Sequence, residues 1–405
     1  MRAKGKLVAV LTYNSGLWGA RMSLMGAAQW ARRNADWRFA IQEHRIDEQS
    51  LAAQMRGADG IIVSAPILAK SPRSFPRDVP TVVTEPFPKD AASASWLEGR
   101  AQVRVDSRMI GRLAAEYYLE RRYESFAYVA DTLELRWDGE RRDGFRERLA
   151  EAGFGCAVYE GFTKRERSSW IAERPRMMAW LAALPKPTAV LAAMDGRARL
   201  VLDACAEAGI AVPVEIAVLG VDNDPLLCEM AHPRLSSIRE NGVLRGRQEA
   251  EMLAALMDGR RLGRMVANIP PGGVETREST GHRAMTNPLL AKGLVFIRDT
   301  AGRRALGVGQ VVSAMGCSRR MAERLFSDGI GHTVKDEIER VRFAAVMKLL
   351  RTTSLPIAEI AALCAFPDES GLSRRFLSLF GETPSRWRRN NGRETPAEAW
   401  QDATP

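Results

Sequence analysis

The chain has few residues of the kinds that build metal sites and disulfide frameworks. Its 405 residues include only four histidines and five cysteines, and the cysteines are scattered without a CxxC pair. Structural metal sites need clustered histidine or cysteine ligands. An odd number of scattered thiols is typical of reduced cysteines in the cytoplasm, not of a secreted disulfide framework. We therefore expect a cytoplasmic protein without a metal ion or a cofactor.

Long apolar runs are missing as well. No apolar run reaches 18 residues, so we expect neither a transmembrane helix nor a membrane partner. The N-terminal stretch MRAKGKLVAVLTYNSG enters a strand-like run at once and lacks the hydrophobic region of a signal peptide. No nucleophile–base pattern stands out either, so the sequence does not predict an enzyme. The length leaves room for two or three domains.

Two tandem helix-turn-helix patterns occupy the last quarter of the chain. In each, a short helix and a tight turn precede a second helix that carries polar and basic residues. Gly316 permits positive φ in the first turn, and Ala365 holds the matching place in the second. Val312 and Ala361 stand where the paired helices cross. The two patterns read VGQVVSAMGCSRRMAERLF, at 308–326, and IAEIAALCAFPDESGLSRRF, at 357–376.

The segment between the two patterns predicts a helical spacer. Residues Thr333–Thr352 form one continuous helical pattern, and Thr333 with Asp336 resembles a capping box. Twenty helical residues span about 30 Å, close to the roughly 34 Å between successive major grooves on one face of B-DNA. Ser318 and Asp368 are expected to cap the second helices of the two patterns. One chain could therefore place two helices in adjacent grooves.

Charge and motifs together indicate double-stranded DNA as the partner. From Ala284 to Arg393 there are 18 lysines and arginines against 10 acidic residues, which suits contacts to phosphates. The stretches SRRMAERLF, MKLLRTTSLPIAEIA and SRRFLSLFGETPSRW resemble the AraC/XylS family over about Asn287–Arg389. The resemblance implies a DNA-binding domain at 287–390, followed by a tail at 391–405.

The same resemblance implies which side chains read the bases. Arginine can pair with guanine, and a carboxylate can accept from cytosine. Alternatively, the two glutamates pair with neighbouring arginines and read nothing. The implied positions are Arg320, Glu323, Arg324, Glu369, Ser370, Ser373 and Arg374.

The first 280 residues predict parallel sheets built from βαβ units, because short apolar runs alternate with helical segments. Ligands of such sheets bind at the carboxyl ends of the strands. Here these ends carry Asn14, Asp106, Asp195 and the run Asp222–Asn223–Asp224, which suit a small molecule rich in hydroxyl groups. The runs are Leu7–Thr12, Trp37–Gln42, Gly60–Ser64, Thr81–Thr84, Val103–Asp106, Phe126–Ala130, Ala189–Ala193 and Ile216–Val221.

The stretches RRDGFRERLAEAG and PTAVLAAMDGRARLVLDACAEAGIAVPVEIAVLGVDNDP, with the closing LSSIREN, form a third group of motifs. They resemble the LacI/GalR regulators and the periplasmic sugar-binding proteins. The resemblance implies a two-lobed sensor at 1–280 with crossovers near Asp106, Asp222 and Ser236–Ile238. Lobe one would comprise about 1–106 and 239–265, and lobe two about 107–238 and 266–280. A linker at 281–286 would follow.

The resemblance also implies the ligand contacts. Asp195 and Asp222 would accept bonds from sugar hydroxyls, and Arg141 would donate one. A structural alternative exists for two positions, because Asp222 could cap the turn before Pro225 and Trp137 could be a surface aromatic. The full set is Asn14 and Arg21 from the first lobe, with Arg136, Trp137, Arg141, Asp195 and Asp222 from the second.

The order of the motifs resembles that of a transcription regulator of the AraC family with a LacI-like sensor. The fold class is a two-lobed α/β sensor of parallel sheets followed by an all-α double helix-turn-helix domain. We expect it to bind a monosaccharide, to act on sugar-use genes and to form a homodimer, with RNA polymerase as a further candidate partner. Two alternatives stay open: the same architecture sensing a non-sugar, and a small-molecule-binding protein without a role in transcription.

Overall fold

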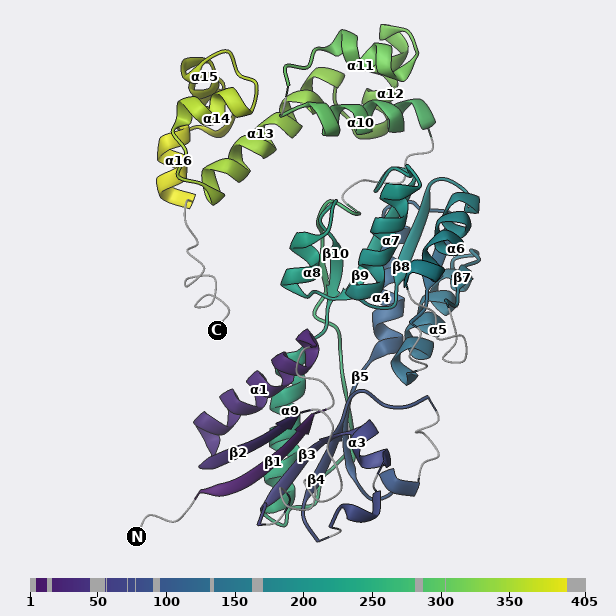
Figure 1. The fold of residues 1–405 in the computed structure, drawn as a ribbon, viewed down its shortest axis with the longest axis vertical. Helices are drawn as coiled ribbons and strands as arrows, with labels where there is room; N and C mark the ends of the chain where they lie inside the picture. Colours follow the sequence, from purple (N-terminus) through teal and green to yellow (C-terminus); the bar gives the residue numbers. More distant parts are fainter. Residues whose placement is uncertain are drawn as a thin grey trace. The chain divides into compact units, whose positions relative to one another are not determined.

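The computed structural model describes residues 5–12, 17–43, 55, 57–70, 72–76, 78–89, 95–131, 135–161, 170–280, 287–302 and 304–391. The chain divides into two compact units, Met1–Ala284 and Met285–Pro405 (Figure 1). The expected linker at 281–286 and nearly all of the tail at 391–405 lie outside the described residues. None of the described helices is long and apolar enough to cross a membrane.

The first lobe of the N-terminal unit is a parallel six-stranded sheet in the order β11-β5-β4-β3-β1-β2. Parallel strands covered on both faces need apolar side chains throughout, and all of β3 is buried. The strands are β1 Lys6–Thr12, β2 Trp37–Glu43, β3 Gly60–Ser64, β4 Thr81–Thr84, β5 Ala101–Val105 and β11 Val266–Ile269. The α-helices are α1 Trp18–Asn34, α3 Ala65–Lys70 and α9 Gly242–Met257, with short 3₁₀ turns at Pro72–Ser74 and Ser95–Leu97.

The second lobe is a six-stranded sheet in the order β12-β10-β9-β8-β6-β7, in which only β12 runs antiparallel to its neighbour. The strands are β6 Phe126–Val129, β7 Ala157–Tyr159, β8 Thr188–Ala192, β9 Ile216–Asp222, β10 Ser236–Arg239 and β12 Val274–Glu275. The helices are α4 Ser107–Glu120, α5 Arg136–Glu151, α6 Trp170–Ala183, α7 Asp195–Glu207 and α8 Pro225–Met230.

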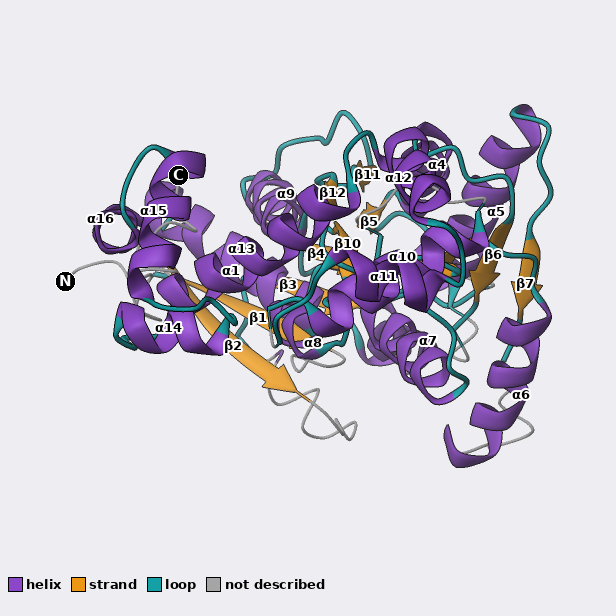
Figure 2. Ribbon diagram, turned by 90° about the horizontal axis from the view of Figure 1, so that it is seen from above, coloured by secondary structure: helices purple, strands orange, loops and turns teal. Residues whose placement is uncertain are grey.

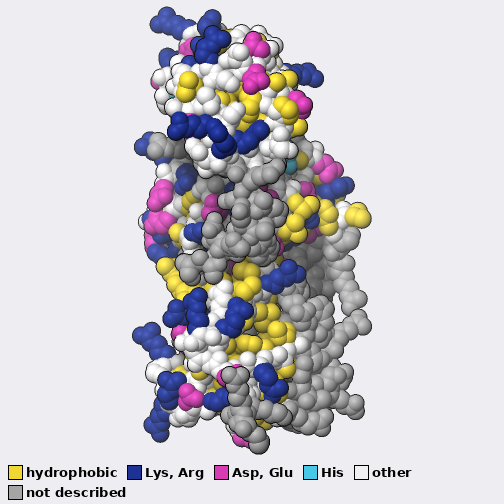
Figure 3. Space-filling view, turned by 90° about the vertical axis from the view of Figure 1, so that its left-hand side faces the viewer, with side chains coloured by type: hydrophobic (Ala, Val, Ile, Leu, Met, Phe, Trp, Pro, Cys, Tyr) yellow, Lys and Arg dark blue, Asp and Glu magenta, His cyan; other side chains and the backbone are white. Residues whose placement is uncertain are grey.

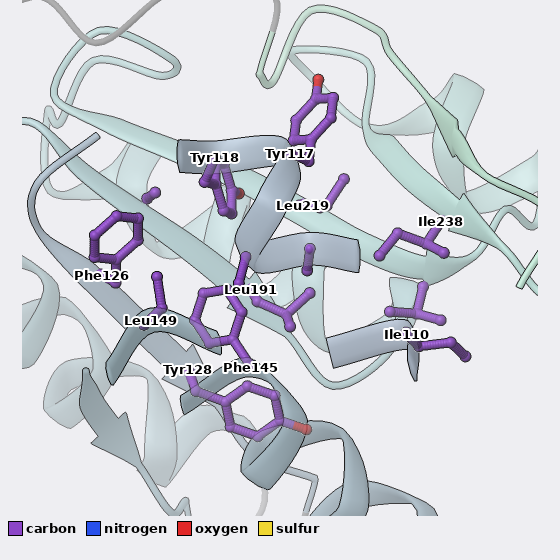
Figure 4. Packing of buried hydrophobic residues seen from close by; sticks show 14 of the residues in the cluster. Ile110, Tyr117, Tyr118, Phe126, Tyr128, Phe145, Leu149, Leu191, Leu219 and Ile238 are labelled. Atoms are coloured by element: carbon purple, nitrogen blue, oxygen red, sulfur yellow. The ribbon is translucent and has the colours of Figure 1, made fainter. Parts of the chain in front are cut away.

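An aromatic core lies between the sheet of the second lobe and helices α4 and α5. Figure 4 shows the rings of Tyr118, Tyr128 and Phe145 packed together, and Phe145 lies 6.5 Å from each tyrosine ring. Gly111 and Gly144 let α4 and α5 approach closely, because a Cβ at either would lie about 2 Å from a carbonyl oxygen of the other helix. This close crossing determines where α5 presents its N-terminal side chains.

The lobe boundaries need one correction. The interpretation that residues 266–280 belong to lobe two is wrong for β11, which pairs in parallel with β5 at the edge of the first sheet. The chain crosses between the sheets after β5, after β10 and again between β11 and β12. It does not cross at Asp222, because β9 and β10 are neighbours in the second sheet. A short strand pattern does not encode which sheet edge the strand will join.

The C-terminal unit contains helices and no strand among its described residues (Figure 2). Helices α10 to α12 pack on the first half of α13, and α14 to α16 pack on its second half, forming two separate cores. The helices are α10 Pro288–Thr300, α11 Val308–Met315, α12 Arg319–Ile330, α13 Val334–Thr352, α14 Ile357–Leu363, α15 Glu369–Phe380 and α16 Pro384–Asn391. The predicted fold class is therefore confirmed.

The predicted turn and cap chemistry of this unit is also confirmed. Gly316 ends α11 with φ 71°, and Ala365 adopts φ 56° after α14. The Ser318 hydroxyl accepts from the Met321 amide at 3.3 Å, and the Asp368 carboxylate accepts from the Gly371 amide at 2.6 Å. The spacer helix α13 begins at a capping box formed by Thr333 and Asp336. Helices α12, α13 and α15 therefore start at the cap residues that the sequence predicts.

Candidate functional site

The carboxyl end of β9 carries an unusual turn. Asp222 and Asn223 both have positive φ, at 111° and 52°, which side-chain-bearing residues rarely adopt. Such a conformation persists only where neighbouring groups hold it. The Asn223 amide donates to the Ser237 hydroxyl at 3.0 Å, and Asp224 caps α8 by accepting from the Leu226 amide. Strained backbone held in this way is common at ligand clamps and switches.

Asp195 is one of the groups that hold this turn. Its carboxylate is buried at the start of α7, where it accepts from the Ser237 hydroxyl at 2.6 Å and from the Asp224 amide at 2.8 Å. Burial raises the pKa of Asp195 to about 7, although these hydrogen bonds favour its ionised form. Asp195 is completely buried, and its two hydrogen bonds hold the turn in place.

Asp222 keeps its hydrogen-bonding capacity. The structure gives its carboxylate no hydrogen-bond partner among the described residues. Burial raises its pKa well above the usual range, and the negative charges of Asp195 and Glu240 add to the rise. Arg141 of the second lobe and Arg245 of the first lie near enough to oppose the rise. Asp222 thus sits among charges from both lobes.

Arg141 is a buried donor with spare capacity. Its Nη1 donates to the Ala193 carbonyl oxygen, and its guanidinium lies 4.8 Å from the ring centre of Trp137. Its Nε is buried without an acceptor among the described residues. Leaving a buried donor unpaired costs roughly 1–3 kcal/mol, so a ligand acceptor here would stabilise the site. Trp137 itself packs against the core of the second lobe, which argues against a surface position.

Arg136 marks a direct contact between the lobes. Its backbone amide donates to the Phe87 carbonyl oxygen of the first lobe at 3.0 Å, and its Nε donates to Glu140 at 2.7 Å. Its Nη1 is buried and unpaired among the described residues. Of the two expected contacts from lobe one, Arg21 lies exposed in the first turn of α1, and Asn14 lies outside the described residues.

The first lobe brings charged residues that the sequence interpretation missed. Glu85 follows β4 directly and accepts from the Phe87 and Val105 amides at 3.0 Å each, while burial raises its pKa to about 7. Arg245 pairs with Glu240 and lies near both Glu85 and Asp222. Polar residues at strand ends indicate candidate ligand contacts, and the same signal would have found Glu85, which directly follows β4.

Among the described residues, no group of three or more histidine, cysteine or acidic side chains could hold a metal ion. The groups gathered from the two lobes around Asp222, namely Arg141, Glu240 and Arg245, are called the cleft below. They offer carboxylate acceptors and guanidinium donors. That combination suits a ligand with several groups that both donate and accept hydrogen bonds, such as hydroxyls.

The second helix of the first helix-turn-helix presents arginines to solvent. Arg320 is exposed, and the Arg324 side chain is 74% exposed with only a 3.8 Å ion pair to Asp328. Glu323 is half-buried, and its carboxylate accepts from the Val334 amide at 3.3 Å. Glu323 therefore caps the start of α13. This is a structural role, but it is not the pairing with an arginine that the sequence left open as the alternative to base contact.

The second helix-turn-helix presents α15. Glu369, Ser370 and Arg374 are exposed, whereas Ser373 is half-buried. No hydrogen bond or ion pair is present for Arg374 among the described residues, but the adjacent Arg375 pairs with Glu339 of α13 at 2.6 Å. Figure 3 shows lysine and arginine side chains spread over the face of the helical unit, at the top of the view. Arg320 and Arg324 on α12 and Arg374 on α15 are thus all exposed to solvent.

Comparisons with known proteins match both units. Residues 115–280 match the family of periplasmic binding protein-like domains, and residues 311–390 match a helix-turn-helix domain family. The xylose operon regulatory protein of Haemophilus influenzae is 30% identical over 290 residues, covering 71% of this chain and 74% of that protein. Its counterpart in Escherichia coli K12 is 30% identical over 253 residues, covering 62% of this chain and 64% of that protein.

Solved structures agree with these matches. The structure of a xylose-binding transcription activator aligns with a TM-score of 0.78 and 26% identity, covering 97% of this chain and all of that one. A lac repressor dimer bound to operator and anti-inducer aligns with a TM-score of 0.53 and 19% identity over 69% of this chain, which shows a shared fold. The first alignment spans both units of the chain.

Proposed function

The chain belongs to the AraC family of transcription regulators that carry a periplasmic-binding-protein-like sensor, and on this premise we propose that its sensor binds a monosaccharide. Sugar binding between the lobes would then change the DNA affinity of the helix-turn-helix unit. A ligand can do this only if it binds the two arrangements of the protein with different affinity.

The observation that carries the proposal is the pairing of spare groups in the cleft. The Asp222 carboxylate, on a half-buried residue, makes no hydrogen bond among the described residues. The Arg141 Nε is buried without an acceptor among the same residues. A sugar hydroxyl can donate to the first group and accept from the second. Arg245 and Glu240 of the other lobe lie within electrostatic reach of Asp222, so the ligand would contact both lobes.

The other predicted cleft residues take supporting parts in this proposal. Asp195 holds the turn that presents Asp222, and Trp137 supports the Arg141 guanidinium from below. Arg136 adds a second unpaired donor at the start of α5. Arg21 and Asn14 stay predictions for the first lobe.

For the DNA interface we propose that Arg324 and Arg374 contact bases and that Arg320, Glu369, Ser370 and Ser373 flank them. Glu323 is better suited to capping α13 than to reading a base. We further propose that the protein acts in the cytoplasm as a homodimer without catalytic activity, and that it contacts RNA polymerase. Sedimentation of the protein with and without DNA tests the dimer.

Isothermal titration calorimetry with D-xylose, L-arabinose, D-ribose, D-glucose and D-galactose tests the sugar proposal. We expect at least one of these sugars to bind the full-length protein, and Asp222→Asn to weaken that binding. Absence of heat with every sugar would contradict the proposal and favour a non-sugar effector in the same cleft.

A further inference from the structure

The segment that leaves the sensor is tied into the second lobe by a buried chain of hydroxyl groups. The Thr280 hydroxyl donates to the Ser236 hydroxyl at 2.6 Å, and the Tyr117 hydroxyl lies 2.6 Å from that of Thr280 (Figure 4 labels Tyr117). The Ser279 hydroxyl donates to the Val218 carbonyl oxygen at 2.6 Å. Ser279 and Thr280 are completely buried, and residue 281 begins the expected linker. The last residues of the sensor are thus held to strands β9 and β10.

Arg277 connects this segment to the strained turn at the ligand cleft. Its Nη1 donates to the Asn223 amide oxygen at 2.9 Å and to the Leu235 carbonyl oxygen at 3.0 Å. Its own backbone amide donates to the Ser236 hydroxyl at 2.8 Å, so one residue joins the turn and the hydroxyl chain. The Arg277 side chain is only 14% exposed, which limits its alternatives to these partners.

Asn223 is the residue next to Asp222, and both have positive φ. A ligand that binds Asp222 acts on a backbone conformation that is costly by itself and is held by hydrogen bonds from its neighbours. The amide oxygen of Asn223 accepts a hydrogen bond from Arg277. Arg277 belongs to the segment Thr276–Thr280, called the exit segment, so a change in the turn alters a hydrogen bond to this segment. Packed elements with two arrangements pass such local changes on.

We propose that Arg277 transmits ligand occupancy of the cleft to the segment Thr276–Thr280, which leads to the DNA-binding unit. This inference rests on the proposed function, because it requires a ligand at Asp222. Arg277 acts here as a positioning residue that touches neither ligand nor DNA.

The chain contains a closely matched control. Arg234 pairs with Glu229 at 3.5 Å, and Arg277 pairs with the same carboxylate at 3.2 Å. Arg234 binds the exit segment too, through Glu278 at 3.1 Å, but no bond joins its side chain to the turn among the described residues. The two arginines therefore differ in the contacts that Arg277 makes to Asn223 and to the Leu235 carbonyl oxygen.

The test measures coupling between the two binding events in the full-length protein. Calorimetry gives the affinity of the tightest-binding sugar of the panel, with and without a duplex selected in vitro for binding to the protein. The coupling ratio is the sugar affinity in the presence of the duplex divided by the sugar affinity in its absence. Thermodynamic linkage requires that the sugar change the DNA affinity by the same factor. We expect a ratio of about 5-fold to 150-fold for the unmodified protein, in either direction. Arg277→Met should bring the ratio close to one, with sugar affinity in the absence of DNA changed by less than about threefold.

Arg234→Met should keep the ratio of the unmodified protein. Asn223→Gly removes the other end of the bond while tolerating the positive φ, and should also bring the ratio close to one, which covers the case in which Arg277→Met does not fold. A full ratio in Arg277→Met or in Asn223→Gly, an equal loss in Arg234→Met, or a ratio of one in the unmodified protein would overturn the inference. Failure of every sugar to bind would instead overturn the proposed function, and this inference with it.

Discussion

At the scale of single residues, the cleft contains two kinds of polar group. Some hold its shape through hydrogen bonds within the protein, and others remain available to bond a ligand. Asp195 uses both carboxylate oxygens within the lobe, whereas Asp222 uses neither among the described residues. Both aspartates end up with raised pKa values because burial disfavours their charged forms. A ligand hydroxyl that donates to Asp222 therefore stabilises the ionised carboxylate, the form that burial disfavours.

Replacing this carboxylate should weaken the ligand response specifically. Asp222→Asn keeps the side-chain size and tolerates positive φ but loses the charge. We expect sugar affinity to fall by roughly 1–3 kcal/mol, because a hydroxyl would lose its charged acceptor. Calorimetry measures the loss, and DNA binding without sugar should stay unchanged. Normal sugar affinity in Asp222→Asn would place the ligand elsewhere.

Glu85 predicts how stability depends on pH. Its pKa is raised from 4.5 to about 7, mainly by burial. The folded protein then keeps a proton that the unfolded chain has lost, so the contribution of Glu85 to stability is full below pH 4.5 and is lost as pH rises to about 7. Glu85→Gln should reduce the fall in unfolding free energy between pH 5 and pH 7 by roughly 1–3 kcal/mol.

Denaturant unfolding of the sensor at the two pH values measures this difference. Glu147→Gln on the surface of α5 serves as the control, because the hydrogen bond from Arg108 lowers the pKa of Glu147 and moves its titration below this window. The same pH dependence in Glu85→Gln and in the unmodified protein would show that Glu85 titrates normally.

At the scale of secondary-structure elements, the second helix-turn-helix has a turn that its sequence does not favour. Ala365 adopts φ 56°, where the first unit has Gly316. The left-handed conformation costs a side-chain-bearing residue roughly 1–2 kcal/mol, partly offset by the greater backbone entropy lost by glycine. Ala365→Gly should therefore raise the unfolding free energy of the helical unit by roughly 0.5–1 kcal/mol.

Thermal unfolding checks the direction of this change. Ala344→Gly, at an exposed position within α13, should lower stability by about 1 kcal/mol, because glycine is a poor helix former. Destabilisation by both substitutions would mean that the turn at residue 365 tolerates alanine without strain.

Helices α12 and α15, the second helices of the two helix-turn-helix patterns, allow a matched test of DNA recognition. Arg324→Ala and Arg374→Ala should each reduce discrimination between specific and random duplexes by roughly 1–3 kcal/mol, because an arginine can grip guanine with two bonds. Arg375→Ala on the same helix should leave discrimination intact, since Arg375 is paired with Glu339. Lys335→Ala should weaken binding evenly on all sequences, if at all.

Competition gel shifts with specific and random duplexes measure these differences. Equal losses on both duplexes for Arg324→Ala and Arg374→Ala would make the two arginines phosphate contacts.

At the scale of the whole molecule, the chain separates its DNA-binding unit from its sensor. All residues proposed to read bases lie in Met285–Pro405, and those of the cleft lie in Met1–Ala284. The segment Ala284–Pro405 should therefore bind duplex DNA by itself, with an affinity that falls steeply as salt rises because phosphate contacts release counterions. Gel shifts at several salt concentrations test this. A segment that is inert at low salt on DNA bound by the full-length protein would contradict the assignment.

The sequence by itself determined the type of those elements whose local signals are strong, whereas the short strands β7, β10 and β11 are not among the predicted runs. Strands β3 and β4 begin and end where the apolar runs do, and the caps at Ser318 and Asp368 form as expected. These features depend on neighbouring residues, whose propensities and hydrogen bonds act over one or two turns of chain. The fold class followed from the order of the elements.

Only the tertiary structure decided which distant groups meet. β11 joins the first sheet beside β5, and Asp195 accepts from Ser237. Glu85 and Asp222, which belong to different lobes, both lie near Arg245. A strand edge, a side-chain direction and a neighbouring charge each depend on packing between segments far apart in the chain. Local sequence carries no information on such contacts. The sequence therefore could not distinguish an aspartate that holds a turn, as Asp195 does, from one whose carboxylate stays available, as that of Asp222 does.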